Sequence, residues 1–162
     1  MAFHDPAVYG RSPLENSSFI ASSRFPDPQV HGVGYVARLS GATAEWISMV
    51  LHMGLGPAPF RVVDGALRFE PRPVLADWLF TNRPTGEFGA DSFGLKLFGK
   101  TWIVYDNPKR CATFGPGAVA PALFELRHAN GTRQTQAGNW LPADQALALR
   151  DGKLASVVIH LD

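Results

Sequence analysis

The stretch FRVVDGALRFE, residues 60–70, decides the fold class. Two short apolar runs lie on either side of Asp64-Gly65, a dipeptide that readily adopts the positive φ angles of a two-residue hairpin turn. The pattern therefore predicts two antiparallel strands joined by a tight turn.

Working outward from this hairpin, the rest of the C-terminal region repeats the same kind of pattern. FGLKLFGKTWIVY (93–105) predicts one long strand, or two strands broken near Gly99, and LFELRH (123–128) with TRQT (132–135) predicts a hairpin around Asn130-Gly131. PADQALALRDG (142–152) predicts a short helix, because Pro stands at its start and Gly past its end. ASVVIHL (155–161) predicts a closing strand. Short strands at regular turn spacing predict a mainly β fold, an antiparallel, jelly-roll-like β-sandwich over residues 58–162.

The region before the hairpin has a different character. Residues 1–38 are rich in Pro, Ser and Gly and predict an ordered loop region. SGATAEWISMVLHMG (40–54) predicts a helix that Ser40 or Thr43 caps and Gly54 ends. This helix has almost no polar face, so we expect it to be buried on most sides. A chain this short offers little to cover it, which indicates a missing partner or self-association.

Composition excludes several classes of protein. The 15 Lys and Arg balance the 14 Asp and Glu and are scattered, so neither a nucleic-acid partner nor a membrane surface is expected. The single cysteine, Cys111, cannot form an intramolecular disulfide, and the N-terminus has no secretory signal. These features favour a soluble, cytoplasmic protein.

Few residues are arranged for chemistry. The five histidines form no close pair, so no metal site is expected, and no serine lies in a nucleophile elbow. The candidate with a physical rationale is the start of the predicted helix, where exposed N–H groups and the helix dipole favour an anion. Its candidate phosphate-binding residues are Ser40, Gly41, Thr43, His31 and Arg38. The alternative is an ordinary helix cap beside a loop.

Aromatic residues of the strand region present a similar choice. They could supply platforms on which sugar rings stack, but strand alternation favours a role in the core. The residues concerned are Trp78, Phe80, Phe93, Phe98, Trp102, Tyr105 and Trp140.

Two further stretches carry a resemblance to a known family. HGVGYVARLSGATAEW (31–46), followed by GLGPAPFRVVDGALRFEPRPVLADW (54–78), resembles the end of the cellobiose and chitobiose phosphorylases. Those enzymes have, in order, a His-Gly loop, a Thr-Gly pair, a helix containing Ala-Ala-Trp, a Gly-x-x-Pro turn, and Gly-Leu-x-x-x-Pro with a tryptophan. VYGRSPLENSSFI (8–20) is similar to tail regions of large phosphorylase-like proteins.

The resemblance implies a division into two parts. Residues 1–57 would be a loop and the last helix of an (α/α)₆ barrel, and residues 58–162 would be the C-terminal β-sandwich. Ser40-Gly41 would stand for the Thr-Gly pair of the phosphate site if Ala42 is an insertion. Without the insertion, Gly41-Ala42 would occupy that place and the hydroxyl would be lost.

The resemblance also implies a function. The family performs inverting phosphorolysis of β-glucosides such as cellobiose, with inorganic phosphate as co-substrate in place of the water of a glycoside hydrolase, and with no other cofactor. Its catalytic acid lies upstream in the barrel, so no catalytic residue is assigned here, and the chain alone is not expected to be active. One alternative is a non-catalytic carbohydrate-binding or structural β-sandwich module. A small independent enzyme is less well supported, since no cluster of His or carboxylates is present.

Overall fold

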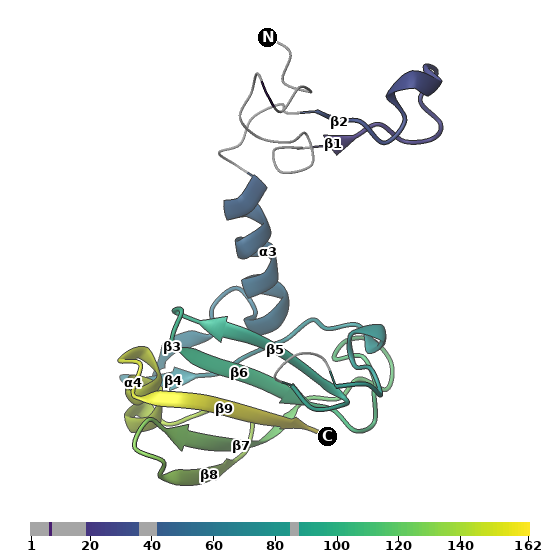
Figure 1. The fold of residues 1–162 in the computed structure, drawn as a ribbon. Helices are drawn as coiled ribbons and strands as arrows, with labels where there is room; N and C mark the ends of the chain where they lie inside the picture. The colour runs from purple at the N-terminus through teal and green to yellow at the C-terminus, as the bar shows by residue number, and fades with distance from the viewer. Residues whose placement is uncertain (1–6, 8–18, 36–41, 85–87) are drawn as a thin grey trace. The chain divides into compact units, whose positions relative to one another are not determined.

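The computed structural model describes residue 7 and residues 19–35, 42–84 and 88–162. The chain divides into two compact units, whose boundary lies between Met49 and Val50, within a helix. The described residues are mainly β, with few helices, as the sequence predicted (Figure 1). The predicted domain boundary at residues 57 and 58 stays a prediction.

The first unit contains a small β element in the region predicted as loop. Strand β1 (Phe19–Ile20) pairs with β2 (Gly34–Tyr35) in antiparallel register. Between them lies the 3₁₀ helix η1 (Pro28–Val30), which Asp27 caps by accepting a hydrogen bond from the Gln29 backbone N–H at 3.0 Å. The two-residue strands explain why no period was visible in the sequence.

Helix α3 (Ala42–Leu55) confirms the helix predicted from residues 40–54. The predicted burial holds only for its C-terminal end, where Leu55 is 2% exposed and Leu51 and Met53 pack against the core. Nearer the N-terminus, Trp46 and Met49 are 64% and 67% exposed. The helix therefore offers apolar side chains that no described residue covers.

Strands β3 (Phe60–Val63) and β4 (Ala66–Phe69) form the predicted antiparallel hairpin. Asp64 and Gly65 have φ angles of 51° and 76°, the left-handed pair that a tight hairpin turn requires. The helix α4 (Ala143–Arg150) packs on β4, and a bridge joins Phe69 to Leu141 just before α4. Pro142 stands at the start of α4 and Gly152, at φ 70°, follows its end, as predicted.

The largest element is a five-stranded sheet in the order β5-β6-β9-β7-β8 (Figure 1). Its strands are β5 (Ser92–Leu97), β6 (Thr101–Asp106), β7 (Pro121–His128), β8 (Arg133–Ala137) and β9 (Leu154–Leu161). The break near Gly99 and the Asn130-Gly131 hairpin confirm the predicted turns. The sheet is mixed, however, because β6 and β9 run parallel. The prediction of a purely antiparallel sheet was wrong at this pair.

One face of this sheet is buried in the core. Alternate residues of the strands point to it, among them Ile103, Tyr105, Phe124, Val157 and Ile159, all 0% exposed. The core cluster is completed from outside the sheet by Leu55, Phe69, Leu75, Phe80, Leu141, Ala146 and Leu149. The end of α3, the β3–β4 hairpin, the segment 71–80 and α4 thus cover this face. On the other face, here called the open face, Phe88 packs on Trp102, and the described residues leave the β7–β8 side exposed.

Candidate functional site

The predicted phosphate-binding residues lie at the edge of what the structure describes. Arg38, Ser40 and Gly41 fall outside the described residues, and Thr43 belongs to the first turn of α3. His31 follows η1, and its Nε2 lies 2.8 Å from the Phe25 carbonyl oxygen. The phosphate site therefore stays a prediction.

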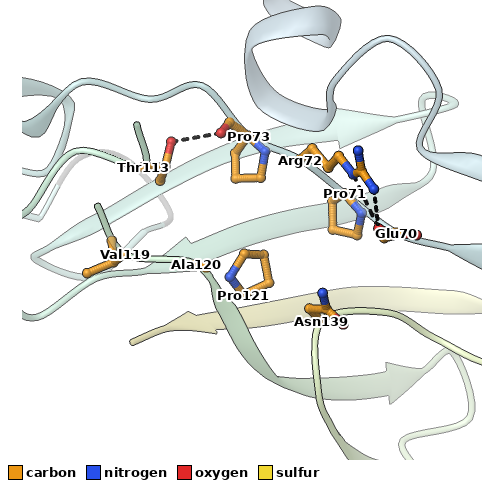
Figure 2. A pocket seen from close by; sticks show the side chains of 9 residues that line it. All are labelled: Glu70, Pro71, Arg72, Pro73, Thr113, Val119, Ala120, Pro121 and Asn139. Carbon is orange, nitrogen blue, oxygen red and sulfur yellow. Dashed lines mark hydrogen bonds and ion pairs between the residues drawn. The ribbon is translucent and has the colours of Figure 1, made fainter. Parts of the chain in front are cut away.

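A pocket of about 270 Å³ lies where β4 leads into the segment 71–73 (Figure 2). Thr113 and Asn139 reach it from two later loops, and Pro71, Pro73 and Pro121 supply apolar rings around it. Glu70 and Arg72 provide the charged groups. The pocket therefore combines apolar walls with polar groups, the usual composition of a small-molecule site.

Glu70 is the charged centre of this pocket, and its side chain is 15% exposed. It accepts hydrogen bonds from Arg72, with Nη2 at 2.8 Å and Nε at 3.2 Å from Oε1, and from Arg61 at Oε2. These bonds, first from Arg72 and then from Arg61, hold the pKa of Glu70 below its usual value. Glu70 is thus a carboxylate near neutral pH, suited to accept hydrogen bonds and unsuited to act as a general acid.

The other polar groups of the pocket differ in whether they are held by hydrogen bonds within the protein or can reach a ligand. The Thr113 hydroxyl donates to the Pro73 carbonyl and accepts from the Leu75 N–H, both at 2.8 Å, so it fixes the 73–75 backbone (Figure 2). Arg72 is 66% exposed and Asn139 is exposed, so both can reach a ligand. A hydroxyl-rich ligand such as a sugar would find a donor at Arg72 and an amide at Asn139. The sequence feature that forms this pocket is the Glu70-Pro-Arg-Pro segment, which the sequence patterns did not predict as part of a site.

The open face of the five-stranded sheet carries a second polar group. His160 of β9 lies between Asp106 of β6 and Glu125 of β7. Its Nδ1 is hydrogen-bonded to Asp106 Oδ2 at 2.8 Å, and its Nε2 lies 3.2 Å from Glu125 Oε1 without the alignment of a hydrogen bond. One imidazole thus joins carboxylates of two strands, an arrangement that the sequence did not predict because these residues are far apart in the chain.

The aromatic residues are divided between core and surface. Phe80 and Tyr105 are buried as expected, at 3% and 0% exposure, but Trp78 is 73% and Phe98 57% exposed. Trp140 receives the Arg68 guanidinium 4.2 Å from its ring centre. On the open face, Lys96 lies 5.2 Å from the Trp102 ring centre and Phe88 meets the same ring edge-on at 5.1 Å. Exposed indoles such as Trp78 are therefore available to stack on a sugar.

Over the described ranges, no set of three or more His, Cys, Asp or Glu is grouped so that it could hold a metal ion. The same part of the chain contains no helix with the length and apolar character needed to cross a membrane.

Comparison with protein-family models, with curated proteins and with solved structures gave no match.

Proposed function

We propose that this chain is the C-terminal part of a carbohydrate-active enzyme of the glycoside phosphorylase type. In the complete enzyme it would support phosphorolysis of β-linked glucosides, with inorganic phosphate as co-substrate. The proposal rests on the order of motifs in residues 31–78, which resembles the end of the cellobiose and chitobiose phosphorylases.

The structural observation that supports the proposal is the unequal burial of helix α3. Its C-terminal end is fixed to the β unit through Leu55 and through the Gly54 carbonyl, which accepts a hydrogen bond of 2.5 Å from the Tyr105 hydroxyl. Trp46 and Met49, by contrast, stay exposed. A helix that belongs to a β domain at one end and to a helical barrel at the other would have this distribution, because the barrel helices would cover the apolar side chains.

The finer features of the fold belong to the same proposal. Residues 1–57 would be the loop and last helix of an (α/α)₆ barrel, and the mixed sheet with its neighbouring hairpin would be part of a jelly-roll-like sandwich. The loop of residues 31–46 would complete the phosphate site, with Ser40 or Thr43 donating to a phosphate oxygen and His31 or Arg38 adding charge.

The test is to express this chain together with the segment that the same reading frame encodes upstream. The longer protein should release sugar 1-phosphate from cello-oligosaccharides only when phosphate is present. Ser40→Ala should weaken its apparent affinity for phosphate about tenfold, since a hydrogen bond to a charged group is lost. Ser23→Ala, at an exposed serine outside the loop 31–46, is the matched control. A reading frame without a barrel, or cleavage that does not depend on phosphate, would refute the proposal.

A second candidate function is a non-catalytic carbohydrate-binding module. The pocket beside Glu70 and Arg72, with Trp78 exposed nearby in sequence, favours it. Affinity electrophoresis of the chain in gels containing β-glucan separates the two candidates. Retardation that Trp78→Ala abolishes would favour the binding module, whereas unaltered migration together with self-association through α3 would favour the enzyme fragment.

A further inference from the structure

The open face of the five-stranded sheet contains a cleft of about 420 Å³ at its β7–β8 side. Its lining includes Arg127 of β7, Arg133 of β8, Ser156 of β9 and Thr135 of β8. The two arginines lie directly opposite each other in the antiparallel register of β7 and β8. The Cβ atoms of residues in this relation lie about 5 Å apart, and both arginines line the same cleft.

Within the described residues, no carboxylate is paired with either of these arginines. Neither side chain has an ion pair or hydrogen bond with any described residue. The nearest carboxylate of the cleft is Glu125, and its Oε1 lies 3.2 Å from His160 Nε2. Like charges opposite each other on a sheet are destabilising, which makes an unneutralised pair costly unless an anion joins it.

The register extends the cationic character across the sheet. Lys96, Trp102, Ser156, Arg127 and Arg133 form one row, each in register with the next. The row holds three cations, one indole and one hydroxyl, and its carboxylate neighbours Asp106 and Glu125 occupy other rows, next to His160. The positive charge of the open face is therefore concentrated along a single line that ends in the arginine pair.

We propose that this cleft is a binding site for a phosphate group, held between Arg127 and Arg133. A phosphate monoester carries a charge close to −2, which two guanidinium groups match, and arginine binds phosphate through paired N–H groups. The hydroxyls of Ser156 and Thr135 can donate to the remaining oxygens. The site is independent of the loop 31–46 and of the phosphorylase proposal. Its ligand is inorganic phosphate or a sugar phosphate.

The experiment is an NMR titration of the full chain, labelled with ¹⁵N, at constant ionic strength with chloride as the counter-ion. Inorganic phosphate is the first probe and glucose 1-phosphate the second. Saturable shifts are expected at the amides of β7, β8 and β9 around the cleft. Tighter binding of glucose 1-phosphate would identify a sugar phosphate as the ligand, and equal binding would identify free phosphate.

Substitutions of the two arginines test whether phosphate binds in the cleft. Arg127→Gln and Arg133→Gln should each weaken phosphate binding about tenfold or more, because a charged hydrogen-bonding partner is lost. Both residues are exposed, so neither change removes a core contact. Arg83→Gln, at another exposed arginine, and Ser40→Ala, in the other predicted phosphate loop, should leave the cleft shifts unchanged.

Thermal unfolding adds an independent measurement. Without phosphate, Arg133→Gln should unfold at a higher temperature than the original chain, since it removes the repulsion. With phosphate, the original chain should gain stability, and at the same phosphate concentration the variant should gain less. Absence of saturable shifts at the cleft, or a phosphate affinity in both arginine variants equal to that of the original chain, would overturn the proposal.

Discussion

The two faces of the five-stranded sheet are formed by the same strands, but they differ in how their polar side chains are paired. On the buried face, each polar side chain has one fixed backbone partner: Tyr105 donates to the Gly54 carbonyl, and Thr101 donates to the Leu154 carbonyl at 2.7 Å. On the open face, His160 lies beside two carboxylates, and Arg127 has no hydrogen bond or ion pair with another described residue. Leaving a buried polar group unpaired is costly, whereas a solvated face can keep groups free for a ligand.

The largest expected effect concerns the buried, apolar face of the sheet. Phe124→Ala removes a side chain that is 0% exposed at the centre of the core. We expect the free energy of unfolding to fall by about 3–5 kcal/mol. Chemical denaturation measures it, and Glu125→Ala, the next residue on the open face, should cost less than about 1 kcal/mol. Equal losses would contradict the assignment of the two faces.

The next effect concerns a buried polar group. Tyr105→Phe leaves the Gly54 carbonyl at the end of α3 without its donor, and we expect a loss of about 1–3 kcal/mol. Burial raises the pKa of Tyr105 above its usual value near 10. The folded state therefore holds this proton more tightly, so stability is full below about pH 10 and falls as the pH rises above it.

Denaturation of the original chain at rising alkaline pH measures this loss. The Tyr105→Phe variant should lose less stability over the same range. If the variant and the original chain show the same alkaline slope, the buried hydroxyl does not cause it.

Loss of the partly buried ion pairs of Glu70 should have an intermediate effect on the free energy of unfolding. Glu70→Gln weakens the hydrogen bonds to Arg61 and Arg72, with an expected loss of about 1 kcal/mol at neutral pH. Because the pKa of Glu70 is lowered in the folded state, its contribution is present above the unfolded pKa, about 4.3, and is lost as the pH falls through the folded pKa. The variant should thus lose less stability than the original chain on acidification. Glu45→Gln, the same change of side chain at an exposed site, is the matched control.

The smallest effect belongs to the open face. Asp106→Asn changes the 2.8 Å contact with His160, in which both side chains are about one-third exposed. We expect a loss below about 1 kcal/mol that becomes smaller in high salt. Unfolding experiments at low and high salt measure it. A loss as large as that of Tyr105→Phe would mean that the open face is covered in solution.

The sequence predicted those parts of the fold that depend on local turn chemistry. Asp64-Gly65 and Asn130-Gly131 identified two hairpins, and Pro142 with Gly152 bounded helix α4. The strand order was not predictable in this way, because the parallel pairing of β6 and β9 joins residues such as Asp106 and His160, 54 apart in the chain. The candidate sites depend on that long-range register. Arg127 and Arg133 become neighbours through a turn that was predicted, but Ser156 reaches them only through the position of β9.

The central position of β9 has a consequence for how this unit is made. The strand that comes last in sequence is inserted between β6 and β7, so before its synthesis the sheet exists only as two separate hairpins, each with an unpaired edge. The five-stranded sheet cannot form until β9 has left the ribosome. A chain that lacks β9 would leave the facing edges of β6 and β7 unpaired. Premature termination here would therefore yield an aggregating product, whereas loss of the edge strand β8 would leave the central pairing of β6, β9 and β7 in place.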